Sequence, residues 1–139
     1  MNIKNIFEKS ADFTIKRIIE IFGIILIIFS ILLLLSFTSY SPEDPNFIFN
    51  NEKEIENILG FRGSYTSDIF FQSFGIISYL IPVTLIFTGI YIFRSKKIFI
   101  LLRNLFYTIL YIILGSFFFS FFYKETFWLT INGNGGFLS

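Results

Sequence analysis

The stretch "IFGIILIIFSILLLLSF", residues 21–37, contains no charged residue. As an α-helix it would rise about 26 Å at ~1.5 Å per residue, close to the roughly 30 Å thickness of the hydrocarbon core of a bilayer. Residues 69–93, "IFFQSFGIISYLIPVTLIFTGIYIF", and residues 104–123, "NLFYTILYIILGSFFFSFFY", are also uncharged. They would rise about 37 and 30 Å. The sequence therefore predicts an all-α, polytopic membrane protein, a transmembrane helical hairpin or bundle with three spans.

The composition agrees with this prediction and excludes several kinds of chemistry. Of the 139 residues, 54% are apolar, and the mean hydropathy is +0.71, more than a soluble core of this size requires. The chain contains no Cys and no His. Thiol chemistry, disulfides and histidine-based acid–base catalysis are therefore excluded.

Within the predicted spans the polar residues are uncharged. Ion and proton pathways usually contain intramembrane Asp, Glu, Lys or Arg, so this pattern is evidence against a pump or coupled transporter. Pairs with small-xxx-small spacing, Ser116 with Ser120 and Thr84 with Thr88, favour close helix packing instead. Pro82 removes a helical hydrogen bond within the second span and predicts a bend there.

The distribution of Lys and Arg predicts the orientation in the membrane. Residues 1–20 and 94–103 together carry eight of these cations, whereas residues 38–68 and the tail from 124 carry three. Because positive segments remain in the cytoplasm, we expect the N-terminus and the loop 94–103 to be cytoplasmic. The loop 38–68 and the tail would then be external.

Residues 1–20 have a pattern of their own, with apolar side chains on one helical face and charged ones opposite. This pattern predicts an amphipathic helix lying on the inner surface of the membrane. A cleaved signal peptide is the rival interpretation of the first apolar run. That run is longer than a signal peptide requires and no small-residue cleavage site follows it, which favours an uncleaved anchor.

Three polar motifs were considered as sites of chemistry, and each has a simpler interpretation. Glu52, Glu54 and Glu56 are spaced around a helix and lack the pattern of a calcium loop, which favours a solvated surface. "RSKK", residues 94–97, is accounted for by membrane topology. "NGNGGF", residues 132–137, lacks the Lys-Ser/Thr ending of a phosphate-binding loop. We therefore predict no catalytic, cofactor-binding or metal-binding residue in this chain.

Two segments resemble the N-terminal four-helix membrane domain, the 4TM region, of FtsK/SpoIIIE-type bacterial DNA translocases. "SYSPEDPNF", residues 39–47, resembles the turn with which the external loop of that domain begins, and it shares Tyr40, Pro42, Asp44 and Pro45. Residues 57–83 are similar to the run that follows in the family, and share Asn57, Leu59, Gly60, Gly63, Asp68, Gln72, Phe74, Gly75, Tyr79 and Pro82. The resemblance extends from about residue 22 to the end, so residues 21–139 are expected to form one anchor domain.

Elementary geometry gives some of these residues a role without the family. Pro42 and Pro45 favour a sharp turn after the first span. Gly60 and Gly63 permit backbone angles that other residues resist. Ser67 or Asp68 is expected to cap the second span by accepting its free N–H groups. On this interpretation the loop ends one helix and begins a short external module, without catalysis.

The resemblance implies a membrane anchor that places a DNA-pumping motor at the division septum of the bacterial inner membrane. It implies a role in cell division and chromosome partition, with the bilayer and division-site membrane proteins as partners and with homo-oligomers formed through the full-length protein. The chain itself would not be an enzyme and would not bind nucleic acid directly. ATP and Mg²⁺ would belong to a motor domain elsewhere in the protein.

The family's fourth span and motor are not found in these residues, so we expect the chain to be a fragment that ends before the fourth span. Two other functions stay open at this point. One is an orphan small membrane protein that packs with partner helices. The other is a channel or transporter subunit, which the uncharged spans disfavour.

Overall fold

The structure is a computed structural model that describes residues 2–40 and 57–122. Its elements are α1 (Ile3–Thr38), α2 (Gly60–Phe74), the 3₁₀-helix η1 (Gly75–Tyr79), α3 (Leu80–Ser95) and α4 (Phe99–Phe122). Three helical stretches are long and apolar enough to cross a membrane, namely Ile3–Thr38, Gly60–Ser95 and Phe99–Phe122. The predicted all-α fold with three spans is therefore confirmed.

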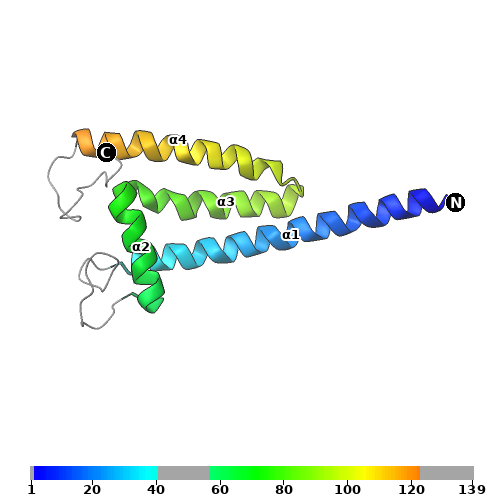
Figure 1. Cartoon of the computed structure of the whole chain (residues 1–139), viewed down its shortest axis with the longest axis horizontal. Helices are drawn as coiled ribbons and strands as arrows, with labels where there is room; N and C mark the ends of the chain where they lie inside the picture. The colour runs from blue at the N-terminus through cyan, green and yellow to red at the C-terminus, as the bar shows by residue number, and fades with distance from the viewer. Residues whose placement is uncertain (1, 41–56, 123–139) are drawn as a thin grey trace.

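Helices α1, α3 and α4 lie side by side, and the short helix α2 crosses the ends of α1 and α3 (Figure 1). In this arrangement α3 lies between α1 and α4, and each neighbour is antiparallel to it. The chain leaves α1 at the end where α2 lies and returns through α3. The connection between α3 and α4 is at the opposite end.

Helix α1 is longer than a single membrane span. Its 36 residues form one uninterrupted helix, which rises about 54 Å, well above the roughly 30 Å of a bilayer core. The predicted helix in residues 3–20 is present, but it continues the axis of the first span and extends beyond the ends of α3 and α4 (Figure 1). No break separates this segment from the span, so both belong to one continuous helix. Its location on the membrane surface stays a prediction.

The backbones of α1 and α3 touch at two glycines. A Cβ atom added at Gly23 would lie 2.9 Å from the Gly89 carbonyl oxygen and 3.0 Å from the Phe93 backbone nitrogen. Ser30 and Thr88 are also fully buried at these helices. Within a membrane the hydrophobic effect does not drive helices together, because lipid tails are as apolar as the side chains. Small residues let the helices approach closely and gain dispersion contacts instead.

Helices α3 and α4 are joined by side-chain hydrogen bonds. The Asn104 amide Nδ2 donates to Thr88 Oγ1 at 2.9 Å, and the hydroxyls of Thr84 and Tyr111 are hydrogen-bonded at 2.9 Å. Ser116 is fully buried in α4. The expected use of uncharged polar side chains in helix packing is thus confirmed at Thr84 and Thr88.

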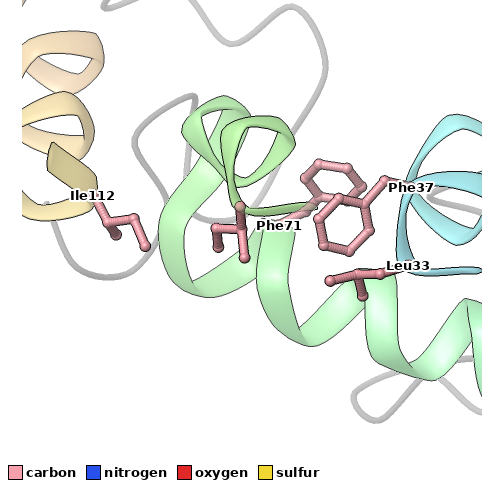
Figure 2. Close-up of a cluster of buried hydrophobic side chains, with 5 residues drawn as sticks. Leu33, Phe37, Phe71 and Ile112 are labelled. Carbon is pink, nitrogen blue, oxygen red and sulfur yellow. The ribbon is translucent and has the colours of Figure 1, made fainter. Parts of the chain in front are cut away.

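The buried apolar residues gather near the α2 end of the bundle. Leu33 and Phe37 of α1, Phe71 of α2, Ile81 of α3 and Ile112 of α4 form one cluster to which every α-helix contributes. Figure 2 shows the Phe37 and Phe71 rings beside each other, with Ile112 approaching from α4. Away from this cluster, large apolar side chains cover the outer faces of α1 and α4, as expected of helices surrounded by lipid.

The second apolar run does not form one straight helix. The sequence predicts a bend at Pro82, but the chain changes direction at Gly75, between α2 and η1. Gly75 has φ 71° and ψ −149°, a conformation open essentially to glycine alone. Pro82 lies in the first turn of α3, where its missing N–H would have no helical partner in any case. The location of the bend is therefore a correction to the sequence prediction.

The ends of the connections also differ from the prediction. Residues 60–68, expected in the external loop, form the first part of α2. Helix α4 begins at Phe99 and includes Arg103, so the connection after α3 is shorter than residues 94–103. Lys96 ends α3 in a left-handed conformation, with φ 58°. Pro42, Pro45, the three glutamates 52, 54 and 56, and the glycine-rich motif 132–137 lie outside the described residues.

Candidate functional site: the α2 cap

The family-like residues that the structure describes are concentrated at one end of the bundle. All of them except Pro82 lie in two segments, residues 36–40 at the end of α1 and residues 57–79, which include α2 and η1. We call these two segments the α2 cap. In Figure 1 the cap is where α2 crosses the ends of α1 and α3. The contacts within the cap show what the shared residues do.

Asn57 joins the start of α2 to the end of α1 by hydrogen bonds. Its amide Nδ2 donates a hydrogen bond to the Ser36 carbonyl at 2.9 Å, and its Oδ1 accepts one from the Leu59 backbone N–H at 3.1 Å. The Ser36 hydroxyl in turn donates to the Gly63 carbonyl at 2.6 Å. Asn57 and Ser36 are both buried. The Asn57 amide thus provides a hydrogen-bond donor for a carbonyl at the end of α1 and an acceptor for an N–H in the turn before α2. An apolar side chain could provide neither.

Two glycines near the start of α2 have different physical requirements. A Cβ atom added at Gly63 would lie 2.3 Å from Asn57 Oδ1 and 2.6 Å from Leu59 Cβ, so Gly63 leaves room for the Asn57 side chain. Gly60 has open space around it, but its φ is +69°. Gly60 is therefore required by backbone conformation and Gly63 by contact.

Asp68 is part of a buried hydrogen-bond network. It lies in the middle of α2 with 1% of its surface exposed. The Tyr40 hydroxyl donates to Asp68 Oδ1 at 3.0 Å, and the Gln72 amide Nε2 approaches the same oxygen at 3.5 Å. The expectation that Ser67 or Asp68 caps the second span is wrong, because both residues are internal to α2. Ser67 instead donates back to the Gly63 carbonyl at 2.8 Å.

Aromatic rings fill the space between α1, α2 and η1. The Phe71 ring lies 4.9 Å from the Phe37 ring, 4.7 Å from the Tyr40 ring and 5.1 Å from the Tyr79 ring, measured between centroids. The Tyr79 hydroxyl donates to the Phe37 carbonyl at 3.1 Å. These tilted contacts are favourable for aromatic pairs. They hold η1 against the end of α1.

The bend at Gly75 is held from both sides. The Ser78 hydroxyl donates to the Phe70 carbonyl at 2.9 Å, which joins η1 back to α2. On the other side Ile77 contacts α4 at Gly115, where an added Cβ would lie 2.6 Å from Ile77 Cδ1. The segment that follows the bend therefore also packs against α4.

The opposite end of the bundle has an ionic contact instead. Lys96 Nζ lies 3.2 Å from Glu20 Oε1, and Arg17 pairs with the other oxygen of the same carboxylate. Partial burial alone would raise the pKa of Glu20, but the hydrogen bonds from Lys96 and Arg17 outweigh it and hold this pKa below its usual value. Lys96 of the "RSKK" motif therefore has an intramolecular partner.

The described residues offer little for catalysis. No group of three or more Asp or Glu residues that could hold a metal ion occurs within residues 2–40 and 57–122. A groove of ≈ 420 Å³ lies between α1 and α2. What the described residues of the cap supply is a set of hydrogen bonds and ring contacts that join α2 and η1 to the end of α1.

Comparison with known proteins identifies the family. The family described as "4TM region of DNA translocase FtsK/SpoIIIE" matches residues 15–138, which include all the described parts of the cap. The chain belongs to this FtsK/SpoIIIE 4TM family. The resemblance stated from the sequence is therefore confirmed.

A curated relative of the FtsK 4TM chain is the DNA translocase FtsK of Shewanella oneidensis. The two are 31% identical over 81 residues, which cover 58% of this chain and 9% of the relative. The chain thus spans less than a tenth of that protein by this match. No solved structure matches the chain.

Some residues of the FtsK 4TM cap were not found by sequence reasoning. Ser36, Ser64 and Ser78 were not predicted to have any role in the cap, yet all three are buried there. A usable signal was present in α2, where the buried residues Gly63, Ser64, Ser67, Asp68 and Phe71 recur at helical spacing. A stripe of small and polar residues at this period indicates a helix face packed against another backbone.

Proposed function

We propose that this chain is the membrane-anchoring and septum-localising part of an FtsK-like DNA translocase that acts in cell division and chromosome segregation. The observation that carries the proposal is the family match over residues 15–138, combined with three apolar helices and a cap built from the family-like residues. An anchor needs stable insertion and a defined end to present to other proteins. The bundle supplies the first and the α2 cap the second.

We further propose that the cap faces away from the cytoplasm. Eight of the eleven Lys and Arg residues lie in residues 1–20 and 94–103, at the end of the bundle opposite the cap, and positive segments favour the cytoplasm. A single cysteine at position 50 should react with an impermeant thiol reagent in intact cells, and one at position 95 should react only after the membrane is opened. The reverse labelling would contradict this orientation.

The proposal assigns no reaction and no nucleic-acid binding to these residues. DNA translocation, ATP and Mg²⁺ would belong to the motor of the full-length protein. The partners of this part would be the bilayer, membrane proteins of the division site and further copies brought together through the full-length chain.

A fluorescent fusion of residues 1–139 in dividing bacteria tests localisation. We expect a band at mid-cell, and even membrane fluorescence from a control fusion of residues 1–40, which keeps α1 but lacks α2, α3 and α4. Even fluorescence from both fusions would contradict septum localisation. That result would favour the alternative, a small membrane protein that packs with other partner helices.

A further inference from the structure

The groove between α1 and α2 is amphipathic along its length. Phe29, Leu32 and Leu33 of α1 line it with apolar side chains, and Arg62 and Thr66 of α2 line it with polar ones. Phe29 and Leu32 are 56% and 43% exposed. From Phe29 to the end of the groove at Ser36, α1 rises about 10 Å. The groove therefore runs from the level of α2 into the apolar part of the first span.

Helix α2, which contributes the cationic side of this groove, has exposed apolar residues of the kind that favour the membrane boundary. Helix α2 crosses the ends of α1 and α3 (Figure 1) and still exposes large apolar side chains, with Phe61 at 52% and Ile69 at 42%. Ile58, just before it, is 68% exposed. A helix with exposed apolar residues at the end of a bundle lies among the lipid headgroups, where these side chains reach the acyl chains.

Arg62 is the charged group at the groove. Its side chain is exposed, and within residues 2–40 and 57–122 it forms no ion pair. The other polar groups nearby are already used: the Ser36 hydroxyl donates to the Gly63 carbonyl, and the Thr66 hydroxyl donates to the Arg62 carbonyl. A guanidinium binds a phosphate through two parallel hydrogen bonds, which a single ammonium cannot do.

We propose that this groove binds one anionic phospholipid. The lipid phosphate pairs with the Arg62 guanidinium, and one acyl chain lies along Phe29 and Leu32. Charge complementarity selects a lipid with net negative charge over a zwitterionic one. The bound lipid fills the space between α1 and α2 and so supports the α2 cap. This site does not depend on septum localisation or on the orientation of the bundle.

Lipid titration of the purified chain in detergent, followed by native mass spectrometry, tests the proposal. Phosphatidylglycerol is the probe and phosphatidylethanolamine the zwitterionic comparison. We expect one phosphatidylglycerol to be retained preferentially. Arg62→Gln should weaken its binding by about tenfold or more, the loss expected for a charge-assisted hydrogen-bonded pair. Arg62→Lys should weaken binding less, because the charge remains.

Two further variants separate this groove from general attraction to positive charge. Arg94→Gln removes one cation at the opposite end of the bundle and should leave the retained lipid unchanged. Thr66→Phe keeps Arg62 but fills the groove, and it should weaken binding. Circular dichroism of each variant checks that the helices are intact. Equal loss in Arg62→Gln and Arg94→Gln, undiminished binding in Arg62→Gln, or equal retention of the two lipids would overturn the proposal.

Discussion

At the α2 cap, α1 is joined to the following helix by buried hydrogen bonds and aromatic contacts, whereas at the opposite end it is joined to the α3–α4 connection by charges. Asn57 at the cap is 4% exposed, while the side chains of Lys96 and Glu20 are 37% and 13% exposed. Water and salt weaken an exposed ion pair, and a buried polar group that loses its partner has no water to replace it. Substitutions at the cap should therefore lower stability more than substitutions at the opposite end of the bundle, which we call the ionic end because Glu20 and Lys96 pair there.

The largest effect is expected from Asn57→Ala. The substitution removes the hydrogen bonds that the Asn57 side chain forms with the Ser36 carbonyl and the Leu59 N–H, and it should lower stability by about 2–4 kcal/mol. Unfolding of the purified chain in detergent measures this loss. The matched control is Asn2→Ala, which removes an exposed cap at the start of α1. Equal effects of the two variants would show that burial at the cap does not matter.

The next effect is expected at Gly63. Gly63→Ala places a methyl group against Asn57 and should cost about 1–3 kcal/mol. Gly60→Ala meets no neighbour but must keep φ at +69°, so it should cost about 1 kcal/mol. The same unfolding assay compares the pair. A smaller loss at Gly63 than at Gly60 would contradict the close contact between Gly63 and Asn57.

A smaller effect is expected at the ionic end from Glu20→Gln. Because the pKa of Glu20 is lowered in the folded chain, its contribution to stability is present above the ordinary value of 4.5 and is lost as the pH falls through the folded-state pKa. The stability difference between wild type and variant should thus shrink with acid and also with added salt. Thermal unfolding across pH and salt checks this. A difference that persists in high salt would mean that Glu20 acts through packing.

The smallest effect on the bend is expected from Pro82→Ala. The residue occupies the first turn of α3, and the bend depends on Gly75, so the bend should persist. Because the Pro82 ring is fully buried, the small cavity left by alanine should cost about 1 kcal/mol. Gly75→Ala in the same assay should be clearly destabilising. If Pro82→Ala is the more harmful of the two, the bend is set by proline as the sequence suggests.

Hydropathy predicts the spans because the cost of placing charge in lipid acts on each residue independently of the fold. Residues 21–37 carry no charge and suit the hydrocarbon core of a membrane, and the structure places them in α1. The absence of charge in residues 69–93 does not indicate where the chain changes direction. Pro82 was the helix-breaking residue that the sequence displayed, so the bend was predicted there. The φ of Gly75 is set by contacts of η1 with Phe37 and α4, which a single sequence does not display.

The α2 cap itself was not predicted from the sequence, which placed residues 38–68 in a loop, but the resemblance identified several of the residues that form it. Ser67 and Asp68 look like solvent-facing or capping residues in a segment of mixed polarity. In the structure both are buried, but Asp68 accepts a hydrogen bond from the distant Tyr40, whereas Ser67 donates to the Gly63 carbonyl one turn back. The partner of a buried polar group is a tertiary property. The family-like residues indicated which part of the sequence forms the cap. They did not indicate which contacts each residue forms.

In this structure α2 crosses the bundle instead of extending the second span as a straight helix. The chain has no native cysteine, so Phe61→Cys and Phe93→Cys, both exposed, can be spin-labelled without background. A straight helix would separate these positions by about 48 Å at ~1.5 Å per residue. Pulsed electron paramagnetic resonance in lipid nanodiscs should give a clearly shorter distance if the chain bends at Gly75. A single distance near 48 Å would contradict the α2 cap.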